Sequence, residues 1–157
     1  LARLLTPCIL ATDSYLPDYD DIPYEHRDQP HHADWVRLAS DLALLRRGEE
    51  AHTPLWSFQT HRREGYVRIA PAPIIACEGI HALHEPILPL LSLKVFVEAP
   101  GDIRWARWEA IERSGERGWG VEKARAFFLD VAEPTFAALA PAYRAHADVI
   151  VINDHPQ

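Results

Sequence analysis

The chain has 157 residues, of which 48% are hydrophobic and 25% are charged, and these values are ordinary for one globular domain. Its formal net charge of −7 argues against broad electrostatic binding to nucleic acid or to an anionic membrane. No apolar run approaches the roughly 20 residues that a membrane-spanning helix needs, and no signal peptide is recognisable. These features predict a cytoplasmic protein whose partners are small molecules.

The absence of methionine and the placement of the two cysteines lead to two further predictions. The sequence contains no methionine and begins with Leu1, which predicts that it is part of a longer translation product, with Leu1–Leu5 as the end of a helix. Cys8 and Cys77 lie in apolar stretches, so free thiols are favoured over a disulfide or a metal pair. The sequence does not fix an oligomeric state, and a homo-oligomer stays open.

In chain order, the first predicted element is a buried strand at residues 8–12, followed by an acidic, proline-broken loop. A helix is then expected from about Asp34, because apolar residues recur at intervals of three and four as far as Leu45. Aromatic and β-branched residues at 52–58 and 66–70 predict a hairpin with a long charged loop.

The second half alternates helices with short apolar runs, and this pattern predicts an α/β protein with a parallel sheet in one domain, residues 1–157. Asp102 is expected to cap a helix that ends near Ser114, and the final helix is expected to break at Pro134. The remaining predicted elements are buried strands at 73–77 and 93–97, a short helix at 86–91 and a final strand at 148–152.

Two carboxylates, Asp13 and Glu78, end two separate predicted strands. Because the carboxyl ends of parallel strands meet at one edge of a sheet, both side chains are expected at one crevice. Two hard oxygen ligands there suit Mg²⁺, which usually keeps several waters and shares substrate phosphates, and either group could instead be a general base. Strand-end acids are also common as caps of the next turn, and that reading stays open.

Arginines cluster farther along the chain, and planar guanidinium groups suit phosphate oxygens. Arg104 and Arg107 are three residues apart on one predicted helix and are therefore expected to share a face. Arg113 and Arg117 bracket a glycine-rich segment that is a candidate mobile lid. The alternative is a solvated helix face whose arginines pair with neighbouring glutamates. His61 lies in the basic hairpin loop, and the adjacent pair His31-His32 does not by itself predict a metal site.

These segments together resemble the uridine kinase branch of the P-loop kinases, which also includes the phosphoribulokinases. The resemblance extends from Ile9 to Ile152, and it rests on the order and spacing of short motifs rather than on any one of them. The motifs, as they stand here, are Thr12-Asp13-Ser14-Tyr15, Asp28-Gln29-Pro30-His31-His32-Ala33-Asp34-Trp35, Pro54-Leu55-Trp56-Ser57-Phe58-Gln59-Thr60-His61-Arg62-Arg63, Ile75-Ala76-Cys77-Glu78-Gly79-Ile80, Glu116-Arg117-Gly118 and Ala147-Asp148-Val149-Ile150.

The resemblance implies the P-loop kinase fold, a three-layer α/β sandwich with a mostly parallel sheet, a protruding hairpin at about 51–70 and a helical lid at about 104–120. It implies ATP and Mg²⁺ as cofactors, Asp13 as the catalytic carboxylate and Glu78 as its partner on the metal. It further implies substrate contacts by Asp28, Tyr15, Trp56, His61 and Arg63, and phosphate contacts by the lid arginines Arg104, Arg107, Arg113 and Arg117.

The sequence also departs from the family. The phosphate-binding loop, Gly-x-x-x-x-Gly-Lys-Ser/Thr, is absent, so we expect it within about 30 residues upstream of Leu1 and expect the given chain to be inactive without it. The family's hairpin Tyr-Asp pair is Trp56-Ser57 here, its second lid arginine is Trp119, and a nucleoside-contacting glutamine is Phe127. The expected function is phosphate transfer from ATP to a uridine- or cytidine-like nucleoside. A phosphoribulokinase-like or other sugar or metabolite kinase, or a non-catalytic binding protein, remains the alternative.

Overall fold

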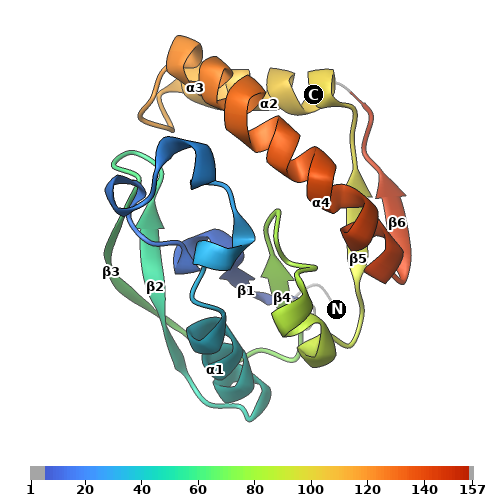
Figure 1. The fold of residues 1–157 in the computed structure, drawn as a ribbon. Helices are drawn as coiled ribbons and strands as arrows, with labels where there is room; N and C mark the ends of the chain where they lie inside the picture. Colours follow the sequence, from blue (N-terminus) through green and yellow to red (C-terminus); the bar gives the residue numbers. More distant parts are fainter. Residues whose placement is uncertain (1–5, 156–157) are drawn as a thin grey trace.

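The structure is a computed structural model that describes residues 6–155, so the expectation for Leu1–Leu5 falls outside the described residues. Within this range the strands form three separate pairs (Figure 1). Strand β1 (Cys8–Ala11) pairs in parallel with β4 (Ile75–Glu78), and β5 (Val95–Glu98) pairs in parallel with β6 (Val149–Ile152). Strands β2 (Ala51–Ser57) and β3 (Arg62–Ile69) form an antiparallel hairpin. The predicted α/β class and parallel pairing are confirmed. Within residues 6–155, no strand of one parallel pair is paired with a strand of the other.

The hairpin differs from its prediction in the length of its turn. Strand β3 begins at Arg62, so only residues 58–61 form the turn, and the charged residues 62–65 belong to the strand. The long charged loop predicted at 59–65 is therefore wrong. Charged residues do not require a loop, because the side chains of an exposed strand can point into solvent while its backbone stays paired.

Helix α1 (Trp35–Arg46) matches its prediction. The Asp34 side chain accepts a hydrogen bond from the Arg37 backbone N–H at 3.0 Å and caps the helix. The apolar stripe of Leu38, Leu42 and Leu45 is buried against β1 and the segment that follows it. This packing fixes the segment that carries Asp13. The main core cluster consists of Leu10, Tyr15, Leu38, Leu42, Leu45, Ala51 and Ile87.

Helix α2 (Gly101–Ser114) leads through a glycine-rich connector, residues 115–120, into α3 (Val121–Phe127). The predicted Asp102 cap is wrong, because Pro100 occupies the cap position and Asp102 lies in the first turn. The predicted break at Pro134 is also wrong. A π-helical turn at Phe128–Ala132 joins α3 to α4 (Glu133–His146), and Pro134 is tolerated because it lies in the first turn of α4. The short helix predicted at 86–91 is a 3₁₀ helix, Glu85–Leu90.

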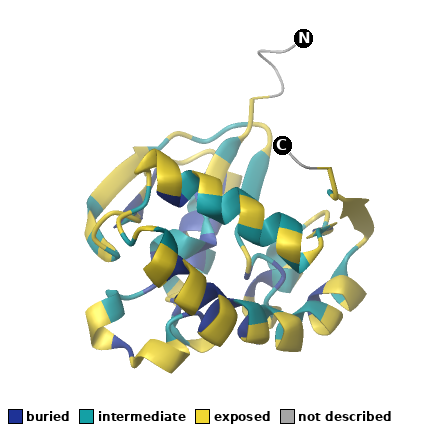
Figure 2. Cartoon of the chain, turned by 90° about the horizontal axis from the view of Figure 1, so that it is seen from above, coloured by how far each residue is buried: buried dark blue, intermediate teal, exposed yellow. Residues whose placement is uncertain are grey.

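Burial is uneven between the two parallel pairs (Figure 2). Of β5, only Phe96 is buried, against Leu83 and Tyr143 of the cluster formed with α4. The final strand predicted at 148–152 is observed as β6, and all four of its residues are exposed. Among the described residues β6 has β5 as its sole paired neighbour, and apolar sequence alone does not bury an edge strand. No helix within residues 6–155 combines the length and apolar character needed to cross a bilayer.

Candidate active site

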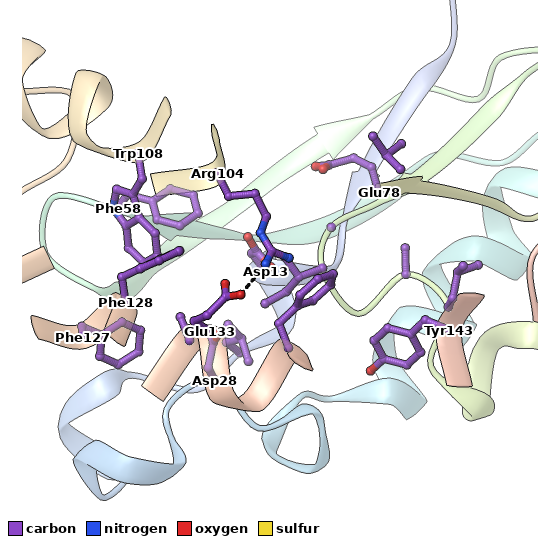
Figure 3. Close-up of a pocket in the computed structure, with 18 of the residues that line it drawn as sticks. Asp13, Asp28, Phe58, Glu78, Arg104, Trp108, Phe127, Phe128, Glu133 and Tyr143 are labelled. Carbon is purple, nitrogen blue, oxygen red and sulfur yellow. Dashed lines mark hydrogen bonds and ion pairs between the residues drawn. The ribbon is translucent and has the colours of Figure 1, made fainter. Parts of the chain in front are cut away.

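A cavity of about 710 Å³ lies between the two parallel pairs (Figure 3). Its walls include Cys77 and Glu78 at the end of β4 and Val95–Val97 of β5. Charged groups gather at one part of it, and aromatic rings surround the adjacent part. The charged residues that line it are Asp13, Asp28, Glu78, Arg104, Arg117 and Glu133.

Asp13 lies in a 3₁₀ turn, Thr12–Tyr15, directly after β1. The register pairs Ala11 with Glu78, so both carboxylates come from the carboxyl end of one strand pair, as predicted. Gly79 makes this corner possible, because its φ is +130° and a Cβ there would lie 2.0 Å from Thr12 Oγ1. The close approach of Gly79 thus fixes where Asp13 enters the cavity.

The electrostatics of Asp13 and Asp28 are coupled. Burial, with the nearby charge of Glu78, raises the pKa of Asp13 to about 6. Burial, with the nearby charge of Asp13, raises the pKa of Asp28 to about 7. Arg117 opposes both shifts through its positive charge. Two carboxylates poised near neutral pH in one cavity are typical of a site that handles protons.

Asp28 is held in place through its backbone. The carbonyl oxygen of Asp28 lies 3.0 Å from His81 Nε2, and the other ring nitrogen of His81 lies 3.0 Å from the Tyr143 hydroxyl. His81 and Tyr143 are both buried. Burial lowers the pKa of His81 to about 4, so the ring is neutral at pH 7 and joins the loop to α4 without adding charge.

The four predicted lid arginines separate into two groups. Arg117 lines the cavity, with its guanidinium carbon 4.4 Å from the Phe58 ring centroid and 5.0 Å from that of Trp108. Arg104 also lines it and forms a 2.5 Å ion pair with Glu133. By contrast, Arg107 donates to the Asn153 side chain at 2.9 Å, and exposed Arg113 pairs with Glu109 at 2.7 Å. The shared face expected for Arg104 and Arg107 therefore does not bring both to the cavity.

Three predicted substrate contacts lie behind the cavity wall. Tyr15 is fully buried, and its hydroxyl donates to Asp41 at 2.9 Å. Arg63 donates to the Leu16 carbonyl at 3.0 Å and so ties the hairpin to the segment after β1. Trp56 is buried, with its ring centroid 5.3 Å from that of Tyr19. The structure gives these side chains positions that support the wall rather than line it.

The aromatic part of the cavity contains predicted His61 and residues that sequence reasoning did not assign to the site. Tyr19, Trp119 and Phe127 line it together with His61. The lack of any motif around Tyr19 explains why it was missed, whereas Trp119 and Phe127 were visible as departures from the family pattern. Burial, aided by the charges of Lys123, Arg117 and Arg27, lowers the pKa of His61 to about 4. His61 is therefore a neutral ring at pH 7.

Comparison with known proteins identifies the group to which this arrangement belongs. The sequence model described as "Phosphoribulokinase / Uridine kinase family" matches residues 21–155. This chain belongs to that family. The match begins after Asp13, so the family model does not cover this residue. Its assignment to the site depends on its place in the cavity and on the motif around it.

Individual relatives agree with the family match. The chain is 31% identical over 150 residues to a uridine kinase of Deinococcus deserti, covering 91% of this chain and 72% of the relative. It is 33% identical over 151 residues to a uridine kinase of Lactobacillus johnsonii, covering 91% and 71%. The solved structure of a possible uridine kinase from Bacillus stearothermophilus superposes with a TM-score of 0.57 at 15% identity, covering 96% of this chain and 74% of that one. The fold is therefore that of the P-loop kinases, as the resemblance implied.

Proposed function

We propose that this protein is an ATP-dependent kinase that transfers the γ-phosphate to a hydroxyl of a nucleoside. The observation that carries the proposal is the meeting of Asp13, Asp28 and Arg117 in one cavity beside a group of aromatic rings. Carboxylates suit the hydroxyls of an acceptor, a guanidinium suits phosphate oxygens, and flat rings suit a base. The uridine kinases among the relatives support this acceptor class.

In the proposed reaction Asp13 accepts the hydroxyl proton while the acceptor oxygen forms a bond to the γ-phosphorus and the bond to the ADP oxygen breaks. A pKa of about 6 leaves Asp13 mostly ionised at pH 7 yet still able to take a proton. Asp28 would hold a second hydroxyl of the acceptor and so orient the first. Arg117 would stabilise charge on the transferred phosphoryl group, since phosphoryl transfer depends mainly on positioning and electrostatics.

The same corner suits a magnesium ion. Residues 6–155 hold no cluster of three or more His, Cys, Asp or Glu side chains that could bind a metal by themselves. Mg²⁺ typically takes one or two carboxylates together with waters and substrate phosphates, and Asp13 with Glu78 fits that requirement. When bound, the ion would neutralise charge on the phosphates. Partial burial raises the pKa of Glu78, so both carboxylates would favour a nearby cation.

The phosphates of ATP need a cradle that the given sequence does not contain. The edges of β4 and β5 that face the cavity lack strand partners within residues 6–155, and both strands belong to parallel pairs. We propose that a further strand, followed by the glycine-rich phosphate loop, joins the two pairs there. The given chain without such a segment would be inactive, and the complete protein would act in the cytoplasm, where ATP is available.

The proposal is tested by assaying the complete protein with ATP, Mg²⁺ and a panel of uridine, cytidine and ribulose 5-phosphate. We expect phosphate transfer to at least one nucleoside and its loss in Asp13→Asn. Transfer to ribulose 5-phosphate alone would replace the nucleoside with a sugar phosphate. Absence of transfer to every acceptor, with no effect of Asp13→Asn on ATP hydrolysis, would overturn the catalytic assignment and favour a binding protein.

A further inference from the structure

The rings in the aromatic part of the cavity pack against one another. The His61 ring is covered on one side by Trp119, at a centroid distance of 4.2 Å and an interplanar angle of 12°, and stacks with Tyr19 at 5.4 Å and 30°. Phe127 closes the group with its edge contact to Trp119 at 4.7 Å. Stacked rings at 4.2 Å leave no room for a third ring between them. We call Tyr19, His61, Trp119 and Phe127 the aromatic box.

The backbone on both sides of Trp119 is held in place. The Gly118 N–H donates to the Phe58 carbonyl at 3.1 Å, and the Gly120 N–H donates to the buried Glu112 carboxylate at 2.9 Å. Gln59 Nε2 also donates to the Gly115 carbonyl at 2.6 Å. The connector is thus fastened to the hairpin turn and to α2, so displacement of the indole would be a movement of the Trp119 side chain and not of its backbone.

His61 is held equally firmly, and in an unusual conformation. Its φ of +55° lies in the left-handed region that non-glycine residues rarely adopt. Its N–H donates to the Ser57 carbonyl at 2.7 Å, and its carbonyl accepts from the Tyr19 N–H at 3.1 Å. Strained positions that the surroundings maintain are concentrated at ligand sites. The ring of His61 is therefore presented toward the cavity that Asp13 and Asp28 also line.

A ligand that places hydroxyls at Asp13 and Asp28 has its remaining part against the aromatic box. The box offers ring faces and few polar groups, so it recognises a flat ring by stacking rather than by the hydrogen bonds at the ring's edge. One face of His61 is already taken by Trp119. A flat ring can stack on that face only after the indole has left it.

We propose that Trp119 is an internal ligand of the acceptor pocket and a specificity-determining residue. Its indole occupies the stacking position over His61 that the base of a nucleoside takes, and nucleoside binding turns the indole out. This inference rests on the proposed nucleoside kinase function and adds two consequences. Acceptors without a flat ring do not compete with the indole, and bases that differ only at their edges are discriminated weakly.

The inference predicts whether one substitution strengthens or weakens the binding of uridine. In Trp119→Ala the competitor is gone, so uridine should bind about threefold to tenfold more tightly, the range that corresponds to one aromatic pair. Methyl β-D-ribofuranoside, which has the hydroxyls but no base, should bind with unchanged affinity. Trp105→Ala is the matched control, because Trp105 is a tryptophan of α2 that does not line the cavity. Titration calorimetry on the complete protein measures all three.

Each alternative result has a distinct meaning. Weaker uridine binding in Trp119→Ala would make Trp119 a wall of the pocket and overturn the inference, and so would an equal gain for the riboside. Absence of uridine binding in every variant would overturn the proposal of a nucleoside acceptor, and with it the inference.

A measurement on the unsubstituted protein avoids the possibility that a variant fails to fold. The Trp119 indole N–H signal should shift on addition of uridine while the amides of Gly118 and Gly120 stay protected from exchange, and an unchanged indole signal in the saturated complex would contradict displacement.

Discussion

The two parallel strand pairs have similar sequences and very different surroundings. β1–β4 lies against α1 and the hairpin, and Leu10 at its centre is fully buried. β5–β6 is at least as apolar, yet Val97 is 54% exposed and Ile152 is 58% exposed. Apolar strands are buried only where other elements cover their faces and edges. Among residues 6–155 this covering is more extensive for the first pair, although Ile9 of β1 is still 56% exposed.

The two pairs contribute different parts of the proposed site. We call β1–β4 with α1 and the hairpin the buried half, and β5–β6 the exposed half. The buried half carries the residues of the proposed acceptor side, namely Asp13, Asp28 and the hairpin with His61. The exposed half contributes Val95–Val97 to the far wall of the cavity and leaves the edge of β5 facing it. If the proposed phosphate-binding strand lies between β4 and β5, β5 becomes an interior strand in the complete protein and β6 stays at the edge of the sheet. The following experiments test this comparison.

The largest effect is expected at the catalytic corner. Asp13→Asn in the complete protein should lower the rate of phosphate transfer by about 10²–10⁴-fold, because a positioned acid–base group contributes that much, while uridine affinity changes little. Steady-state kinetics measure the first quantity and calorimetry the second. The matched control is Asp20→Asn, an exposed aspartate that pairs with Arg62 outside the cavity. Equal rates of phosphate transfer in both variants would contradict the catalytic role of Asp13.

A second experiment compares the cores of the two halves. Leu10→Ala should lower the free energy of unfolding by about 2–5 kcal/mol, the usual cost of a fully buried leucine. Val97→Ala should cost less than about 1 kcal/mol in the given chain, because half of its side chain already contacts solvent. Urea unfolding measures both. In the complete protein we expect the cost of Val97→Ala to rise, and an unchanged cost there would contradict a strand between β4 and β5.

A third experiment isolates the close approach that positions Asp13. Gly79 and Gly65 have nearly equal φ, +130° and +134°, but a Cβ at Gly65 meets nothing within 4 Å. Both alanine variants place a side chain at an unfavourable φ, and only Gly79→Ala also displaces Thr12. We expect Gly79→Ala to be about 1–3 kcal/mol less stable than Gly65→Ala, the usual cost of overpacking, and to lose activity that Gly65→Ala keeps. Equal stabilities would show that the corner can relax without cost.

The smallest expected effect is on the pH dependence of stability. The pKa of Asp28 is raised in the folded state from 3.8 to about 7, so folding favours its protonated form. The stability that this contributes is fully present below pH 4 and is lost as the pH rises through about 7. Asparagine resembles the protonated acid, so the stability of Asp28→Asn relative to the unsubstituted protein should grow by on the order of 1 kcal/mol for each pH unit between about pH 4 and pH 7. Unfolding curves that stay parallel over this range would contradict a shifted Asp28.

Local patterns accounted for much of the fold. The cap at Asp34 and the spacing of Leu38, Leu42 and Leu45 specified α1 because both act within a few turns of one helix. The carboxylates at the ends of β1 and β4 were also predictable, since parallel pairing brings the strand ends to one edge. The hairpin turn and the helix through Pro134 were not, because there long-range pairing and a π-helical turn outweigh local signals.

The sequence by itself determined the family, the strand-end acids and the order of the motifs, because these depend on residue types at short spacing. Only the tertiary structure decided which arginines reach the cavity, since Arg104 and Arg107 are three residues apart and are held by partners from different segments. It likewise placed Tyr15, Trp56 and Arg63 behind the wall and stacked Trp119 on His61. Such contacts join residues separated by tens of positions, and the packing of whole elements sets them.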